Sequence, residues 1–400
     1  MAVIVGAPLG PGRRRKQGDD RDAGRRMTMR VLHVTEALLG GVATYFKEIL
    51  PVQQARLGRD NVFVLVPTSQ TSNLPPDLPL TIATYPVSGR NAMSVLMLFG
   101  AILRAIFRFR PDVVHAHSTF AGVAVRLCGL LLLWKRPRIV YCAHGWSFLR
   151  DVKPWINRLT ALLERLLAYC CDAVTNISYY EYEAALRAGL PASRNLVLRY
   201  GLSPANADPG PLLRLDRTCL NCFFIGRHDR QKGLDLLIDA FRNLPPDQYQ
   251  LYVAGSSVLG DAAAIGDSLP ANVHMLGWID NNKVDAYYRQ FDLLLVPSRW
   301  EGFGLVVLEA MRNGIPVVSS DRGALPEIVQ DGVSGRIFRL AEPGSLATLL
   351  LSLTREQLGQ MGQSGARRFR DEFSAARMNE ETLNLYRKIL RVQAPLRAAA

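Results

Sequence analysis

The chain has 400 residues, of which 48% are hydrophobic and 21% charged, and its formal net charge is +13. This length is sufficient for two α/β domains with complete cores, and near-average glycine and proline contents exclude fibrous and low-complexity classes. The net charge is +4 in residues 1–29, +9 in residues 30–200 and zero in residues 201–400. We therefore expect the first half of the molecule to face an anionic partner.

Residues 1–29 combine an arginine-rich run with mixed charge and show no apolar periodicity. This composition predicts a disordered tail. The apolar region that a secretory signal needs does not follow the arginines, so we expect no signal function here.

Five apolar segments predict the strands of a first domain over residues 30–201. They are residues 30–34, 61–66, 112–117, 139–146 and 172–178, the last of which closes the sheet. Gly40 and Gly41 precede a helical period, where paired glycines let backbone N–H groups approach a phosphate; a plain tight turn is the alternative. His144 stands near the carboxyl end of a strand, where parallel sheets bind ligands, although a lone histidine is usually structural.

Three predicted helices of this domain are strongly apolar. Residues 93–110 carry an apolar stripe with a basic end, and residues 120–134 are shorter than the ~20 residues that span a bilayer. Residues 154–171 combine apolar residues with Arg158 and Arg165, which predicts a basic amphipathic helix lying on a membrane; an ordinary half-buried helix is the alternative. No basic motif interleaved with aromatic residues is present, so an anionic membrane surface fits better than nucleic acid.

The six cysteines are irregularly spaced, and Cys170 and Cys171 are adjacent. This pattern does not fit a disulfide framework and favours a reducing, cytoplasmic compartment. Cys219 and Cys222 have the spacing of a metal or redox pair, but no second pair accompanies them and an apolar run follows. Buried cysteines of a strand are the favoured interpretation.

Residues 202–216 are rich in proline, alanine and aspartate, which predicts a linker. A second domain is expected over residues 217–375, with strands at residues 222–225, 250–254, 273–279, 291–296 and 316–320. Residues 355–395 are helical and basic, and residues 376–400 form a terminal helix and tail. Two sets of strands alternating with helices imply two doubly wound α/β domains that face each other across a cleft.

Two carboxylates frame a glycine-containing turn after the strand at 291–296. Glu301 precedes a predicted helix and Glu309 lies within it. Helical geometry over eight residues corresponds to about 800°, which would place the side chains about 80° apart and about 12 Å along the axis. This separation suits two parts of one elongated ligand, such as a sugar and a ribose; a solvated Glu301 and a salt-bridged Glu309 are the alternative.

The segment PSRWEGFGLVVLEAMRNGIPVVSSDRGALPEIV, residues 297–329, resembles retaining glycosyltransferases of family 4. Gly226-Arg227 and Lys232-Gly233 form a second signature of that family, and the resemblance covers nearly the whole chain after residue 29. It implies a GT-B fold of two Rossmann-like domains, with a terminal helix that crosses back to the first. It also implies transfer of a hexose from a UDP- or GDP-linked sugar to a glycan or lipid-linked acceptor in cell-surface polysaccharide synthesis.

The resemblance also implies roles for individual residues. The leaving diphosphate would contact Arg227, a planar fork, and Lys232, a mobile point charge, unless these are solvated surface cations. The complete set comprises Gly40 and Gly41 at the diphosphate, Glu301, Phe303, Gly304 and Leu305 at the donor sugar, His144 beside the transferred sugar, Glu309 at the ribose, and Gly277, Trp278 and Ile279 at the nucleobase. Residues 112–117 resemble a family segment with a histidine near the cleft; buried structural histidines are the alternative. Tyr200-Gly201 resembles the family's interdomain Asn-Gly turn, with tyrosine in place of asparagine.

We expect no obligatory divalent metal or other cofactor. The only Asp-x-Asp sequence lies in the tail, at residues 20–22, and two cations already serve the phosphate. A GT-B epimerase or phosphorylase, or a non-catalytic sugar-nucleotide-binding protein, is the alternative function; the last would need neither Arg227 nor Lys232. The expected location is the cytoplasm, at the inner face of the cell membrane.

Overall fold

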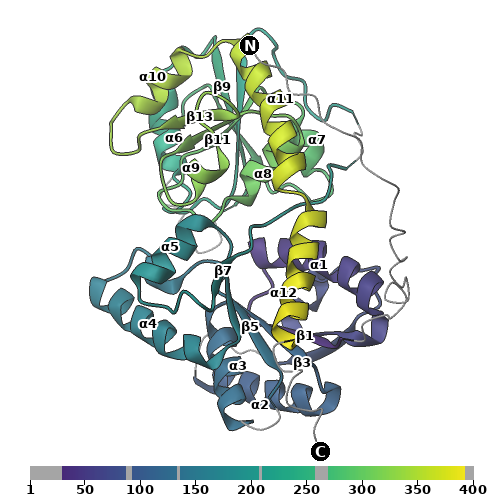
Figure 1. Ribbon diagram of the computed structural model, residues 1–400. Coiled ribbons are helices and arrows are strands. Elements are labelled where there is room, and N and C mark those ends of the chain that lie inside the picture. Colours follow the sequence, from purple (N-terminus) through teal and green to yellow (C-terminus); the bar gives the residue numbers. More distant parts are fainter. Residues whose placement is uncertain (1–28, 87–91, 133–135, 207–209, 257–268, 392–400) are drawn as a thin grey trace, which may run out of the picture.

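The computed structural model describes residues 29–86, 92–132, 136–206, 210–256 and 269–391. These form two α/β lobes, one above the other in Figure 1. The predicted tail through residue 28, residues 207–209 of the predicted linker and residues 392–400 lie outside this description. Met29, predicted as part of the tail, is instead buried in the core of the first lobe because it directly precedes the first strand.

The first lobe contains a seven-stranded sheet in the order β3-β2-β1-β4-β5-β6-β7, and every strand pair is parallel. Its strands are β1 (Val31–Thr35), β2 (Val62–Pro67), β3 (Thr81–Tyr85), β4 (Val113–His117), β5 (Arg138–Cys142), β6 (Ala173–Asn176) and β7 (Asn195–Val197). The prediction that residues 172–178 close the sheet is wrong, because β7 pairs beside β6. The strand predicted over residues 139–146 ends at Cys142, because the backbone turns to a positive φ of 52° at His144.

Helices cover both faces of this sheet. They are α1 (Gly40–Leu57), α2 (Ala92–Phe109), α3 (Thr119–Leu131), α4 (Pro154–Leu167) and α5 (Tyr179–Arg187). Alternate strand residues separate the two faces: Val31 belongs to the same core as α1, whereas Leu32 belongs to the core of α2 and α3. The helix predicted over residues 154–171 ends earlier, at Leu167, because the chain continues as a 3-10 turn over Ala168–Cys170.

The second lobe has a six-stranded parallel sheet in the order β10-β9-β8-β11-β12-β13. Its strands are β8 (Leu220–Ile225), β9 (Tyr249–Ala254), β10 (Val273–Gly277), β11 (Leu293–Val296), β12 (Val317–Ser320) and β13 (Gly335–Phe338). Its helices are α6 (Leu234–Arg242), α7 (Val284–Tyr288), α8 (Leu305–Arg312), α9 (Leu325–Ile328), α10 (Ser345–Leu351) and α11 (Arg355–Glu372). Cys219 and Cys222 are buried around the start of β8, as predicted. The strand order reverses at β1/β4 and at β8/β11, which confirms the predicted doubly wound topology.

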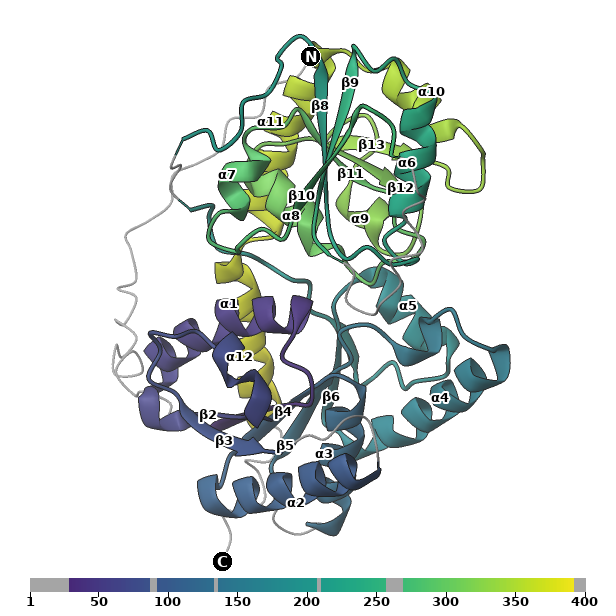
Figure 2. The same cartoon turned by 180° about the vertical axis from the view of Figure 1, so that it is seen from behind.

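The terminal helix α12 (Ala375–Arg391) crosses back to the first lobe, as predicted. Figures 1 and 2 show it, in yellow, beside α1. The single helix predicted over residues 355–395 is divided at Phe373, where Leu202 interrupts it: Leu202 N–H donates to Phe373 O at 3.0 Å, and Ala375 N–H donates to Leu202 O at 2.9 Å. A Cβ on Gly201 would lie 2.2 Å from Ser374 O, so this crossing requires glycine.

Candidate active site

Glu301 and Lys232 form an ion pair at the junction of the lobes. The loops that carry them follow β11 and β8, which are neighbouring parallel strands, so both loops emerge at the same sheet edge. Lys232 Nζ lies 2.6 Å from Glu301 Oε2, and the side chains are 20% and 10% exposed. Because the ammonium is held by one carboxylate at a partly open position, an incoming phosphate could compete for it.

The turn between the two glutamates has tight backbone packing. Gly304 has a φ of 96°, and a Cβ on Gly323 would lie 2.0 Å from Glu301 O. Since α8 begins only at Leu305, Glu301 lies outside the helix, and the predicted helical angle and separation between the two carboxylates do not apply. Glu309 lies one turn into α8, with its Oε2 3.1 Å from Tyr288 Oη, and burial raises its pKa.

Arg227 belongs to the same turn as Lys232 but has other partners. Its Nη2 lies 3.0 Å from Asp229 Oδ2 and 2.9 Å from Gln231 Oε1. Gly233 follows Lys232 with a φ of 72°, and a Cβ there would lie 2.3 Å from Pro297 O. That contact brings the two signature turns against each other and requires glycine at their meeting point.

Gly40 and Gly41 begin α1 on the opposite side of the junction. A Cβ on Gly41 would lie 3.4 Å from Leu305 Cδ1 and 3.9 Å from Tyr200 Oη. The first N–H groups of α1 therefore lie close to the start of α8, where they have no partner within their own helix. The structure thus brings the glycine pair, Leu305 and the turn of Glu301 to one place.

His144 lies at this junction but has protein partners at both ring nitrogens. Its Nδ1 is hydrogen-bonded to Tyr200 Oη, and its Nε2 lies 2.8 Å from His117 Nδ1. Burial lowers the pKa of His144 to about 3, so the ring is neutral at ordinary pH. A sugar hydroxyl could reach its Nδ1 only by replacing the tyrosine hydroxyl.

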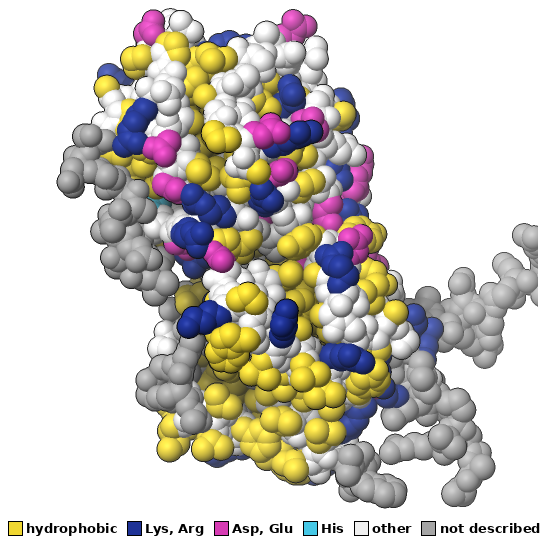
Figure 3. Space-filling model, turned by 90° about the vertical axis from the view of Figure 1, so that its left-hand side faces the viewer, with side chains coloured by type: hydrophobic (Ala, Val, Ile, Leu, Met, Phe, Trp, Pro, Cys, Tyr) yellow, Lys and Arg dark blue, Asp and Glu magenta, His cyan; other side chains and the backbone are white. Residues whose placement is uncertain are grey.

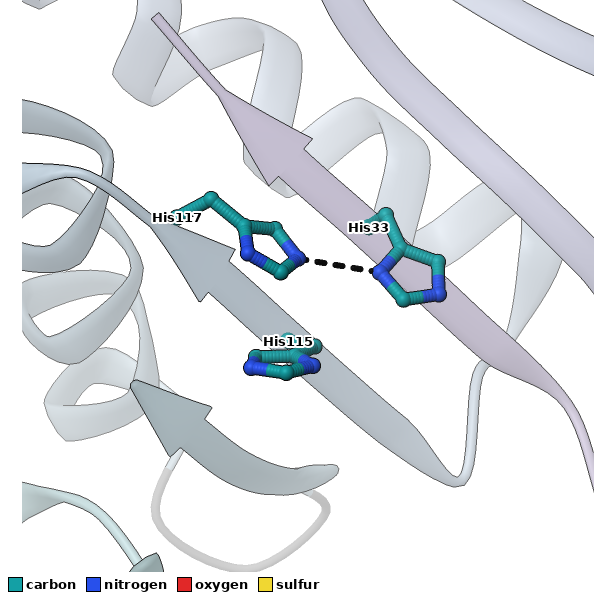
Figure 4. Close-up of side chains that lie close together, drawn as sticks. All are labelled: His33, His115 and His117. Atoms are coloured by element: carbon teal, nitrogen blue, oxygen red, sulfur yellow. Dashed lines mark hydrogen bonds between the residues drawn. The ribbon is translucent and has the colours of Figure 1, made fainter. Parts of the chain in front are cut away.

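Two further histidines continue this hydrogen-bonded chain into the core, as Figure 4 shows for His117 and His33. His117 Nε2 lies 3.0 Å from His33 Nδ1, and His33 Nε2 lies 2.8 Å from Gln53 Oε1. A neutral imidazole has one donor and one acceptor, so the chain is satisfied if every ring carries its proton on Nε2. Burial lowers the pKa of His33 to about 4 and that of His117 well below its usual value.

His33, His115 and His117 form the one group in the described part of the chain whose ligand atoms are close enough for a metal, all within 4.8 Å. In the hydrogen-bonded chain, however, His33 and His117 use both of their nitrogens. His115 Nδ1 lies 2.6 Å from Tyr386 Oη, which leaves His115 Nε2 as the single unused nitrogen of the three rings. The set therefore fits a hydrogen-bonded core rather than a metal site.

The remaining predicted residues are placed around this centre. Gly277 ends β10 with a φ of 71°, followed by Trp278, which is 70% exposed, and the buried Ile279. Gly255 N–H donates to Gly277 O at 2.8 Å, and a Cβ on Gly255 would lie 1.9 Å from Gly226 O, so the end of β10 lies beside the loop that carries Lys232. The Phe303 side chain is buried, with its ring centroid 5.2 Å from that of Tyr200.

Two residues of the junction were not predicted from the sequence as site residues, Tyr200 and Glu181. Glu181 is buried in the first turn of α5, and a Cβ on Gly302 would lie 3.0 Å from its Oε1. Burial raises its pKa to about 8. Ser178 and Glu181 have the spacing of a helix capping box, and Ser178 Oγ does accept from Glu181 N–H at 3.1 Å. That local signal identifies the helix start and says nothing of the opposite lobe.

Comparison with known proteins gives matches along both lobes. The family model described as Glycosyltransferase Family 4 matches residues 39–205, and the one described as Glycosyl transferases group 1 matches residues 219–368. An uncharacterized 41.2 kDa protein in the cps region of Klebsiella pneumoniae is 30% identical over 334 residues, which cover 82% of this chain and 90% of that protein. Phosphatidyl-myo-inositol mannosyltransferase of Mycobacterium leprae is 26% identical over 335 residues, 80% of this chain and 85% of the relative.

Solved structures share the fold. The crystal structure of Anabaena HepE in complex with UDP and glucose matches with a TM-score of 0.72 and 18% identity, covering 90% of this chain and 100% of that one. The two parallel sheets and their arrangement are therefore those of the GT-B fold.

Proposed function

This chain is a glycosyltransferase of family 4, and we propose that it moves a hexose from a UDP- or GDP-linked sugar to a lipid-linked or glycan acceptor in cell-surface polysaccharide synthesis. The observation that carries the proposal is the Lys232–Glu301 pair, 2.6 Å apart, opposite the glycine-rich start of α1. The HepE crystal contains UDP and glucose, which supports a nucleotide sugar as the donor class.

Each charged group has a task in this reaction. As the bond between sugar and diphosphate breaks, negative charge grows on the leaving phosphate. Lys232 and Arg227 would neutralise it, and the first amides of α1 would donate to it. Glu301, released by Lys232, would bind hydroxyls of the donor sugar, and Glu309 those of the ribose.

We further propose that transfer retains the anomeric configuration, as the resemblance to retaining enzymes implies. We also propose that it needs no divalent metal, because Arg227 and Lys232 would supply positive charge at the leaving phosphate. The test is NMR of the product formed from an α-linked donor in buffer with and without EDTA. We expect an α-linked product at the same rate in both. A β-linked product would contradict retention, and complete loss of turnover in EDTA would contradict metal independence.

We also propose that the enzyme works on an anionic membrane surface. Helix α4 turns its polar Asn157 and Glu164 toward the lobe, where Glu164 is buried against Arg126. Its outer face exposes Trp155, Leu159 and Leu166 by 62%, 58% and 59%. An ordinary surface helix would bury such side chains, so this arrangement is typical of a helix whose apolar face meets lipid.

Neighbouring helices extend this apolar surface. Leu96 and Phe107 on α2 and Leu131 on α3 are also exposed, and Figure 3 shows hydrophobic side chains over much of the lower lobe. In the described part of the chain, no helix combines the length and apolar content required to cross a bilayer. We therefore propose surface contact as the mode of attachment, with an acceptor carried by the same membrane.

The decisive experiment is a screen of UDP- and GDP-hexoses for binding and for turnover with membrane extracts as acceptor source. We expect one nucleotide class to bind and its sugar to appear in the lipid fraction. Binding without turnover would indicate a sensor rather than an enzyme. If none of these donors binds, the proposed function is wrong.

A further inference from the structure

A cavity of about 510 Å³ lies where the loop before α4 meets the second lobe. Its charged lining consists of Arg150, Asp151, Arg230, Arg299 and Arg322, and Trp300 forms part of its wall. This volume lies in the range of small-molecule sites, and four guanidinium groups around one carboxylate favour an anionic occupant.

The arginines differ in how firmly they are held. Arg299 forms a two-point ion pair with Asp235, at 2.8 and 2.5 Å, and Arg322 Nε lies 3.1 Å from Asp321 Oδ1. Arg230 pairs with Asp151, and both side chains are at least half exposed. The guanidinium of Arg150 has no partner in the residues that the structure describes. One arginine is therefore available, and a second can exchange its aspartate for a ligand.

Even with all three aspartates counted, the four arginines leave one positive charge. A phosphate group suits this lining, because one guanidinium can donate two parallel hydrogen bonds to two phosphate oxygens. The pocket uses none of the groups assigned to the donor diphosphate, because Arg227 and Lys232 are not part of its lining.

The position of the pocket connects the reaction centre with the membrane-facing surface. Trp300 directly precedes Glu301, and Arg230 lies between Arg227 and Lys232 in the sequence. On the other side, Asp151 is three residues before Pro154, where α4 begins. Figure 3 shows Lys and Arg side chains along the junction of the lobes, above the hydrophobic lower lobe.

We propose that this pocket, the arginine pocket, binds the phosphate or diphosphate of a lipid-linked acceptor. The lipid would extend toward α4 and the acceptor sugar toward Glu301. This inference rests on the proposed function and adds to it the chemical class of the acceptor: an anionic lipid phosphate rather than a neutral glycan.

The test uses the full chain and farnesyl diphosphate in detergent, titrated by calorimetry with UDP or GDP present at saturation. We expect binding that Arg150→Gln weakens by tenfold or more, because a guanidinium without an internal partner is lost. Lys153→Gln removes an exposed cation of the same loop before α4 that does not line the pocket, and it should leave the affinity within a factor of two. Farnesol should not bind measurably.

Three outcomes would overturn the inference. Competition by UDP or GDP would assign the probe to the donor site, and equal affinity of Arg150→Gln and wild type would exclude the pocket. If Arg150→Gln loses binding to phosphatidylglycerol vesicles as strongly as to farnesyl diphosphate, the pocket binds phospholipid headgroups instead. Failure of donor binding with farnesyl diphosphate binding intact would reject the proposed function and leave the pocket assignment standing.

Discussion

The two lobes share a doubly wound parallel sheet but differ in what they bury and what they expose. The first lobe buries His33, His115 and His117 and an Arg126–Glu164 ion pair, and it exposes large apolar side chains on α2, α3 and α4. The second lobe has an aliphatic and aromatic core and balanced charge, and the carboxylate that it buries, Asp285, pairs with the partly exposed Arg312 at 2.9 Å. The shared sheet topology thus brings the ligand-binding loops of both lobes to one junction. The outer surfaces of the two lobes differ and can contact different partners.

The buried ion pair makes this difference concrete. Arg126 Nη1 lies 2.8 Å from Glu164 Oε2, Arg126 Nε donates to Gly122 O at 2.8 Å, and the guanidinium lies 4.0 Å from the centre of the Tyr141 ring. These contacts hold α4 against α3 through polar groups. The buried ion pair therefore contributes, beside the apolar contacts of Ala161 and Leu167, to fixing which face of α4 points outward.

The largest expected effect follows from removing that pair. Arg126→Ala leaves Glu164 buried and uncompensated, so we expect a loss of about 3–5 kcal/mol in the free energy of unfolding, measured by urea denaturation. Arg242→Ala, which removes an exposed ion pair with Asp239 in the second lobe, should cost less than about 1 kcal/mol. Similar losses in both variants would show that the Arg126 pair has no special structural role.

The second prediction concerns chemistry in the second lobe. Lys232→Ala should lower kcat by about 10²–10³-fold, because one preorganised cation at the leaving phosphate is lost. Lys283→Ala, an exposed lysine of the same lobe, is the matched control and should retain full turnover. An unchanged kcat in Lys232→Ala would mean that the leaving diphosphate does not bind at this turn.

The third prediction uses pH to separate the lobes. Burial lowers the pKa values of His33, His115, His117 and His144, to about 4 for His33 and about 3 for His144. Below pH 6.5 the unfolded chain binds protons that the folded chain does not, so stability falls as pH falls. Glu181, with a pKa raised to about 8, acts in the opposite direction, because its folded form keeps a proton between pH 4.5 and 8.

Within the first lobe, the four histidines opposed by Glu181 give a net loss of about 3 kcal/mol between pH 7 and pH 5.5, since each group contributes ~1.4 kcal/mol per pH unit. Glu309 in the second lobe, whose pKa burial also raises, opposes this loss. Urea denaturation at both pH values measures it, and hydrogen exchange should place the loosening in the first lobe. His33→Gln should reduce the pH dependence strongly, whereas His274→Gln should reduce it less, because burial also lowers the pKa of His274 but leaves that side chain partly exposed. Equal stability at pH 7 and 5.5 would mean that these histidines are protonated in the fold.

The smallest expected effect tests the apolar surface. Leu159→Asp on α4 should weaken partitioning onto anionic vesicles about tenfold, because a leucine side chain is withheld from lipid and a negative charge is added. Leu351→Asp, at a position of the second lobe that is 56% exposed, should bind vesicles like the wild type. Equal losses would mean that the membrane does not distinguish the lobes.

The sequence predicted most of the framework because the central strands are apolar runs with turn residues after them. It did not predict β3, β7 or β13. The first four residues of β3 alternate between half-buried and exposed, and β7 and β13 have only three and four residues. The predicted geometry of Glu301 and Glu309 failed because the intervening turn uses left-handed glycine backbone. Tyr200 and Glu181 could not be identified as neighbours of this turn, since their importance comes from contacts across the junction. Likewise, the amphipathic pattern of α4 could not show which face is outside, which depends on Arg126 from another helix.

The pairing of Leu202 with the break before α12 has a mechanical consequence. The chain crosses between the lobes at Leu202 and again at Ser374, just before α12. These two crossing segments are hydrogen-bonded to each other. Lobes tethered at one shared pivot can tilt and twist, but they cannot easily slide apart. Small angular changes at the pivot are therefore amplified with distance from it. The distance that the two lobes move toward each other around a donor would therefore depend mainly on how far the bound ligand lies from this pivot.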